Sequence, residues 1–206
     1  ALPISDTIVG AAKWLSQNPR PDLVMLDIQL ADGTAFDLLD TALEGVKADD
    51  AFCCLGTTIR EAGTKAEFHK VDYGYVLSFA HRMRANGVTH FLLVSAIGAN
   101  PQLPIFYSKV KGLVERDVLA IGFPKTSIFR PSLLLGDRAE ERPGEAMGAR
   151  VSALISPFFV GPLRRMHPIR GSDVASAMVA CAVSSPTENG PARELFYYDH
   201  MQALVS

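Results

Sequence analysis

Short apolar runs alternate with helical stripes along most of this chain. Each run is three to five residues long, which is the length of a buried strand bounded by turn residues. The runs occupy residues 23–26, 51–55, 91–94, 127–129 and 194–198. Their regular spacing, with longer segments between them, indicates that strands and helices alternate.

The segments between these runs carry apolar residues at three- and four-residue steps, as helices with one buried face do. The expected helices cover residues 7–17, 36–43 and 73–84, then run onward from 107 and from 172. The helix over 73–84 has an apolar stripe of Val76, Leu77, Ala80 and Met83, and Asn86-Gly87 would stop it. The helix opened by Tyr107 would bury Val110, Val114 and Val118.

Strands that alternate with helices in this way predict right-handed crossovers and a parallel sheet covered on both faces. Ligands in such sheets bind at the carboxyl ends of the strands. Four residues fall at these ends: Asp27, Gly56, Ser95 and Pro131. We therefore expect a single α/β domain over residues 1–206 whose site lies along that edge.

The stretch SAIGANPQLPIFYSKVK at 95–111 contains the candidate chemistry. Tyr107 and Lys111 have i, i+4 spacing, which places them one turn apart on a helix face. An ammonium group near a phenol favours the phenolate, so Tyr107 would exchange protons nearer to neutral pH. Ser95, at a strand end, would hydrogen-bond the same substrate oxygen. This set is typical of a carbonyl reductase or alcohol dehydrogenase, and a solvated helix face is the ordinary alternative.

Composition and charge argue against two classes of partner, nucleic acid and the membrane. The 206 residues are 48% hydrophobic and 20% charged, with a formal net charge of −2. That charge gives no electrostatic reason to expect nucleic acid or an anionic membrane. No apolar run reaches the roughly 20 residues that span a bilayer, and the N-terminus has no basic segment followed by an apolar one. We therefore expect a cytoplasmic location by default. The scattered histidines and cysteines show no metal spacing.

Residues 1–40 resemble the middle of a response-regulator receiver domain. In PDLVMLDIQLADG, Asp27 stands where that family has its phosphoacceptor aspartate, at a strand end. The acidic pair that would hold Mg²⁺ comes from an earlier strand in that family, and no such strand precedes this one. Asp27 could equally be a polar residue that faces a bound ligand at the edge of the sheet.

From about residue 39 onward the chain resembles an atypical short-chain dehydrogenase/reductase, closest to the branch of the HIV-Tat-interacting protein. The segments that carry the resemblance are AFCCLGTT at 51–58, HFLLVSAIGA at 90–99, IFYSKVKGLVE at 105–115, IFRPSLLLGDR at 128–138, RPGE at 142–145 and PIRGSDVASAM at 168–178. The resemblance implies an NAD(P)-binding Rossmann fold, with NADP or NAD as the cofactor.

The same resemblance assigns roles to individual residues. Ser95, Tyr107 and Lys111 would be the catalytic set, and Lys111 would also hold the nicotinamide ribose. Gly56 and Thr57 would line the cofactor. The nicotinamide would be bordered by Arg130, Pro131, Ser132 and Leu133.

The glycine pattern departs from this family. The family opens with a strand and a glycine-rich turn that binds the pyrophosphate. Here no two glycines are closer than Gly144 and Gly148, so neither G-x-G nor G-x-x-G exists. The strand-helix unit that opens the family is missing or replaced, which suggests a chimaera. The strand at 23–26 could then take the place of the family's third strand.

Three functions remain open on the sequence alone. The first is an NAD(P)-dependent oxidoreductase acting on a small molecule, or a descendant that has lost activity with the glycine turn. In that protein residues 1–40 would complete the sheet, 41–135 would form the Rossmann core and 136–206 the substrate-side part. The second is a non-enzymatic scaffold or recombined α/β fold. A homodimer could supply what one chain lacks. The third is phosphotransfer at Asp27.

Overall fold

The computed structural model describes most of the chain from residue 47 onward. The described residues are 29–30, 33–34, 47–135, 161–184 and 192–205. Three sequence expectations lie outside them, namely the helices at 7–17 and 36–43 and the strand at 23–26 with Asp27.

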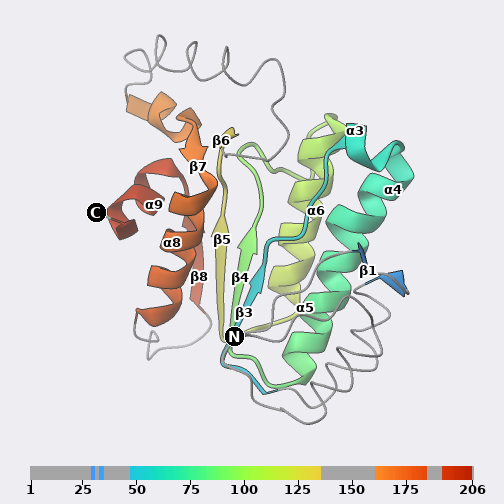
Figure 1. Cartoon of the computed structure of the whole chain (residues 1–206), viewed down its shortest axis with the longest axis horizontal. Helices are drawn as coiled ribbons and strands as arrows, with labels where there is room; N and C mark the ends of the chain where they lie inside the picture. The colour runs from blue at the N-terminus through green and yellow to red at the C-terminus, as the bar shows by residue number, and fades with distance from the viewer. Residues whose placement is uncertain (1–28, 31–32, 35–46, 136–160, 185–191, 206) are drawn as a thin grey trace.

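A four-stranded parallel sheet is the centre of the described structure (Figure 1). Its order is β3-β4-β5-β8, and every neighbouring pair is parallel. The strands are β3 (Asp50–Cys53), β4 (His90–Val94), β5 (Lys125–Phe129) and β8 (Ala192–Phe196). The sequence prediction of a parallel, Rossmann-like α/β sheet is therefore confirmed, and its strands match the apolar runs to within about two residues, the usual uncertainty of element ends.

Helices cover both faces of this sheet (Figure 1). One face carries α5 (Val76–Ala85) and α6 (Phe106–Ala120), and the other carries α8 (Gly171–Val183) and α9 (Tyr198–Val205). The segment before α5 consists of α3 (Ile59–Ala62), α4 (Lys65–His69) and the π-helical turn η1 (Lys70–Tyr75). The predicted helix over 73–84 is thus part of a longer helical segment that begins at Lys65, and the π-helical turn η1 lies between its two α-helical parts.

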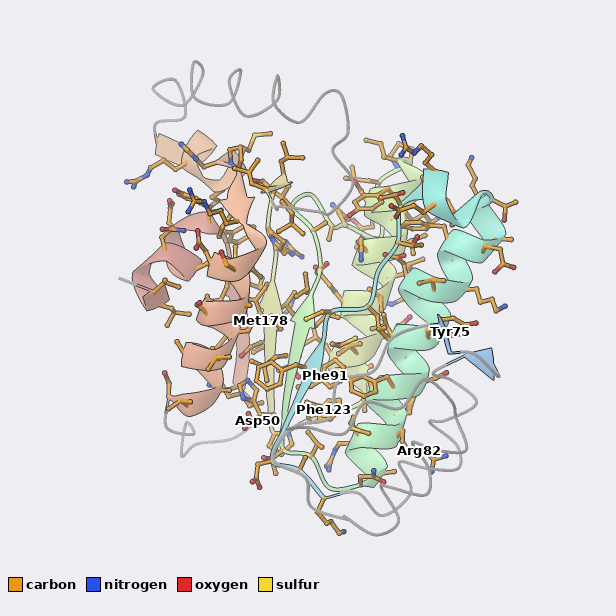
Figure 2. The ribbon with its side chains drawn as sticks, in the orientation of Figure 1. Asp50, Tyr75, Arg82, Phe91, Phe123 and Met178 are labelled. Carbon is orange, nitrogen blue, oxygen red and sulfur yellow. The ribbon has the colours of Figure 1, made fainter. Side chains whose placement is uncertain are left out.

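The two central strands, β4 and β5, divide their side chains between two hydrophobic cores, because successive residues of a strand point to opposite faces. On β4, Phe91 and Leu93 pack with α5 and α6, whereas Leu92 packs with α8 and α9. Figure 2 shows Phe91 and Phe123 on the first side and Met178 on the second. A strand buried on both faces reads as a continuous apolar run, which is why HFLLV was recognisable.

Five short elements complete the described chain. β1 (Gln29–Leu30) and β2 (Gly33–Thr34) pair with each other in an antiparallel two-stranded sheet. β6 (Leu134–Leu135) pairs with β7 (Ile169–Arg170), and a 3-10 helix, η3 (Gly161–Met166), lies between them in the sequence. The described part of the receiver-like segment therefore forms its own small sheet, and the completion of the main sheet by residues 1–40 stays a prediction.

A row of polar side chains crosses the sheet near the amino ends of its strands. His90 Nδ1 lies 2.8 Å from Asp50 Oδ1, and His90 Nε2 lies 2.9 Å from Ser127 Oγ. Ser127 in turn donates to Glu194 Oε2 at 2.9 Å, and Lys125 Nζ lies 3.4 Å from the same oxygen. These contacts join all four strands with side-chain hydrogen bonds in addition to those of the backbone.

Gly112 fixes how closely α6 approaches the loop that follows β4. A Cβ atom on Gly112 would lie 2.2 Å from the backbone nitrogen of Pro101 and 2.3 Å from the carbonyl carbon of Asn100. Neither atom belongs to a flexible side chain, so the space is available only to glycine. This contact sets the position of the helix that carries Tyr107 and Lys111.

We expect Gly112→Ala to lower the free energy of unfolding by about 1–3 kcal/mol, because the added methyl group overpacks a backbone contact. Chemical denaturation measures the change. Gly74→Ala is the matched control in a helical segment, since a Cβ there meets nothing within 4 Å, and it should change stability by less than about 1 kcal/mol. Equal effects of the two substitutions would contradict the close approach.

His90 should make stability fall in mild acid. Burial and the nearby Lys125 lower the pKa of His90 from its ordinary 6.5, against the opposing effects of Asp50 and Glu194. Below about pH 6.5 the His90 imidazole is therefore protonated in the unfolded chain but neutral in the folded protein. The free energy of unfolding should fall as the pH drops through this value.

Denaturation between pH 8 and 5.5 tests this expectation. His90→Gln should flatten the dependence on pH, whereas His81→Gln, at an exposed histidine, should leave it as in the parent protein. A stability that rises toward pH 5.5 would mean that the folded state holds an imidazolium in this row.

Candidate functional site

A buried ion pair lies at the carboxyl end of the sheet. Lys111 Nζ on α6 is 2.6 Å from Asp72 Oδ1 on η1, and the two side chains are 7% and 0% exposed. Two opposite charges removed from water in this way stabilise each other only if their geometry and remaining hydrogen bonds are good. The ion pair therefore requires that η1 and α6 keep their relative position.

The turn after β3 provides one of those hydrogen bonds. The backbone N–H of Thr57 donates to Asp72 Oδ2 at 2.8 Å. A Cβ atom on Gly56 would lie 3.4 Å from both Asp72 Oδ1 and Lys111 Nζ, so the exposed Gly56 backbone runs directly past the ion pair. The two residues expected to line a cofactor, Gly56 and Thr57, thus lie beside the predicted catalytic lysine.

Tyr107 occupies the first turn of α6, one turn before Lys111. Its side chain is 37% exposed, and its ring packs against the buried Phe68 of α4 with centroids 5.6 Å apart. The predicted buried side of this helix, Val110, Val114 and Val118, is confirmed. The helix therefore presents Tyr107 at its exposed end and inserts Lys111 into the protein.

The proton affinity of Tyr107 differs from the sequence expectation. Burial raises the pKa of the phenol above its ordinary 10.0, and Asp72 raises it further, although Lys111 lowers it. The expected shift toward neutral pH is therefore wrong. The lysine does lower the pKa of the phenol, but burial raises it by more, and an aspartate that the motif did not include also opposes the lysine.

Ser95 follows the last residue of β4 and is 5% exposed. Its backbone N–H donates to the carbonyl of Phe129 at 2.7 Å, which extends the pairing of β4 with β5. Its hydroxyl oxygen is buried and has no hydrogen-bond partner among the described residues. A buried hydroxyl without a partner is costly, so this atom is available to a ligand oxygen.

Three of the four residues expected to border the nicotinamide form the hydrogen bonds described next, and the fourth, Leu133, is exposed. Arg130 forms a bidentate pair with the buried Glu115 of α6, with Nε 2.9 Å from Oε1, and also donates to the Tyr197 hydroxyl. Pro131 is buried, and its carbonyl accepts from the N–H of Ile97. Ser132 donates to the carbonyl of His167. Leu133 has a 60% exposed side chain. Of these side chains, only Leu133 is both large and exposed.

Asp72 is the residue of this site that sequence reasoning missed. The sequence contained a sign that Asp72 is buried, because this residue lies one helical turn before the apolar stripe of Val76, Ala80 and Met83. All four residues are buried in the structure. A carboxylate at a position that the helical period assigns to the core requires a partner. Lys111 is that partner, and it comes from a helix remote in the sequence.

The polar row at the other end of the sheet also has the order carboxylate, imidazole, hydroxyl, as in a hydrolase triad. Ser127 is 0% exposed and its hydroxyl already contacts His90, Glu194 and the Cys181 sulfur. A nucleophile must reach its substrate. The row therefore supports the sheet and is not a catalytic centre.

No family model matches the chain, but individual proteins do. Protein FMP52-1, mitochondrial, of Scheffersomyces stipitis is 38% identical over 143 residues, which are 65% of this chain and 59% of that protein. Protein HTATIP2 of Rattus norvegicus is 45% identical over 111 residues, which are 53% of this chain and 46% of that protein. The chain thus spans about half to three fifths of the length of these relatives.

Solved structures share the fold at low sequence identity. The structure of RMD from Pseudomonas aeruginosa complexed with NADPH superimposes with a TM-score of 0.53 at 15% identity, covering 92% of this chain and 74% of that one. At this identity the likeness concerns the fold alone. It agrees with the parallel sheet and its two helical layers.

The expectation of a cytoplasmic location is wrong. It rested on the lack of an apolar segment, and the fungal relatives are named as mitochondrial proteins. The described helices include none with the length and apolar character of a membrane span.

The resemblance to the HTATIP2-like branch of the atypical short-chain dehydrogenase/reductases is thus confirmed, whereas a chimaeric origin stays a prediction: the chain is a Rossmann-fold relative of the HTATIP2 and FMP52 proteins.

Proposed function

We propose that this chain is an NAD(P)-dependent oxidoreductase-like protein that reduces a carbonyl group of a small molecule. The observation that carries the proposal is the buried Ser95 hydroxyl, which has no partner among the described residues and lies at the carboxyl end of a central parallel strand. Parallel sheets of this type bind ligands along that edge.

Each residue of the set has a distinct role in this proposal. Ser95 donates its hydroxyl hydrogen to the carbonyl oxygen of the substrate and orients it. Tyr107 gives a proton to the same oxygen. Lys111, one turn along α6, carries the positive charge that stabilises the developing phenolate. A bound nicotinamide cofactor would supply the hydride.

The raised pKa of Tyr107 favours one direction of reaction. A phenol whose pKa lies above 10.0 is protonated at neutral pH, so it is ready to donate a proton rather than to accept one. Proton donation accompanies reduction of a carbonyl, and proton removal accompanies oxidation of an alcohol. We therefore expect reduction to be the faster direction near pH 7.

The residues present fit the reacting half of a dinucleotide better than its phosphates. Gly56 brings exposed backbone past Lys111, as close approach of a ribose would need. The sequence has no closely spaced glycines to hold a pyrophosphate at a helix N-terminus. Support for the cofactor class comes from RMD, whose structure is titled as a complex with NADPH.

A scaffold without enzymatic activity is the second candidate, and the glycine pattern favours it. In that case the sheet would be retained for its shape, and a homodimer could complete it. Phosphotransfer at Asp27 is the third candidate, and this residue lies outside the described part of the chain. Incubation with acetyl phosphate and Mg²⁺ would test it by mass.

Titration with NADPH and NADH is the primary experiment. We expect saturable binding of at least one of them, followed by its fluorescence. No binding of either at millimolar concentration would overturn the oxidoreductase proposal and leave the scaffold.

Tyr107→Phe tests the chemistry separately from binding. It removes only the hydroxyl, so cofactor binding should persist while carbonyl reduction falls by about 10²–10⁴-fold, the usual contribution of a general acid. Tyr198→Phe is the matched control, since this ring stacks on His167 on the α9 side. Undiminished reduction by Tyr107→Phe would remove the phenol from the mechanism.

A further inference from the structure

The Asp72–Lys111 pair is not explained by stability alone. Both side chains are almost wholly buried, and replacing such a pair by apolar residues of similar size is often neutral or stabilising. A charged pair retained at the edge of the sheet where ligands bind therefore points to a role for the charges themselves.

The backbone around Asp72 is unusual. Asp72 lies in η1, a six-residue π-helical segment between two α-helical ones. π-Helical turns inside α-helices are rare and are frequent at functional sites. The neighbouring Tyr73 donates its hydroxyl to Asp117 Oδ2 at 2.8 Å, so η1 is joined to α6 at two consecutive residues.

The carboxylate of Asp72 is itself held from two sides. Thr57 N–H donates to Oδ2, and the Lys111 ammonium faces Oδ1. Lys111 Nζ lies 3.4 Å from where a Cβ on Gly56 would stand, so a ligand that approached this exposed backbone would meet the ammonium group.

We propose that Asp72 is the positioning residue of this site: its carboxylate, held by the Thr57 amide, fixes the Lys111 ammonium beside Gly56 and sets the net charge that the Tyr107 phenol faces. This inference rests on the proposed function for its meaning. Asp72 itself touches no substrate. It determines whether Tyr107 meets an isolated cation or a neutralised pair.

The proposal has a signature in the titration of Tyr107. Lys111 lowers the pKa of the phenol and Asp72 raises it. Asp72→Asn keeps the shape and the hydrogen bond from Thr57 but leaves the cation uncompensated, so the midpoint of Tyr107 should move to lower pH. Lys111→Met should move it to higher pH. The double variant should fall between the two single variants.

Fluorine NMR of protein labelled with fluorotyrosine measures these midpoints without cofactor. The chain has five tyrosines, and Tyr107→Phe assigns the resonance of interest. Glu67→Gln is the matched control, because it removes a negative charge from the same helical region at an exposed pair with Lys70, and it should leave the Tyr107 midpoint in place. An Asp72→Asn midpoint equal to that of the parent would overturn the proposal.

Two further comparisons keep the test decisive. If Asp72→Asn leaves a buried lysine that prevents folding, the double variant compared with Lys111→Met reports the same effect of Asp72, and identical midpoints would overturn the proposal. Asp72→Glu, which keeps the charge, should hold the midpoint closer to the parent than Asp72→Asn does. If the Tyr107 midpoints shift as expected but NADPH does not bind, only the oxidoreductase proposal is overturned.

Discussion

The buried pair of Lys111 and Asp72 is the constraint on which the arrangement of the site depends. A lysine inserted into the protein would lose its charge or destabilise the fold unless a carboxylate met it. That need ties η1 to α6 and, through the Thr57 amide, to the end of β3. Three segments distant in sequence are thereby held at one edge of the sheet, and Tyr107 is one helical turn from their meeting point.

The two ends of the sheet differ in how their polar groups are satisfied. At the amino end, Asp50, His90, Ser127 and Glu194 bond to one another across four strands. At the carboxyl end, the Ser95 hydroxyl finds no hydrogen-bond partner within the described part of the chain, and the Gly56 backbone is exposed. The first arrangement stabilises the sheet, and the second leaves capacity for a ligand. This contrast, more than the Tyr-Lys spacing, distinguishes the candidate site from the rest of the described surface.

Packing of α6 on its surroundings links the site to the fold. Gly112 admits the loop at Asn100 and Pro101, and Glu115 pairs with Arg130 at the end of β5. The guanidinium of Arg130, a residue expected to border the nicotinamide, donates to Glu115 and Tyr197. Positions near a site can thus serve it by holding a helix in place.

The sequence by itself determined the four strands of the main sheet, the helices α5, α6 and α8 and the parallel topology, because continuous apolar runs and a period of 3.6 residues can be read along the chain. It also indicated Ser95, Tyr107 and Lys111 as residues at strand and helix ends. Only the tertiary structure decided that Asp72 pairs with Lys111 and that the pKa of the Tyr107 phenol is raised above its ordinary value. Burial and charge pairing depend on which distant segments pack together. No local period encodes that.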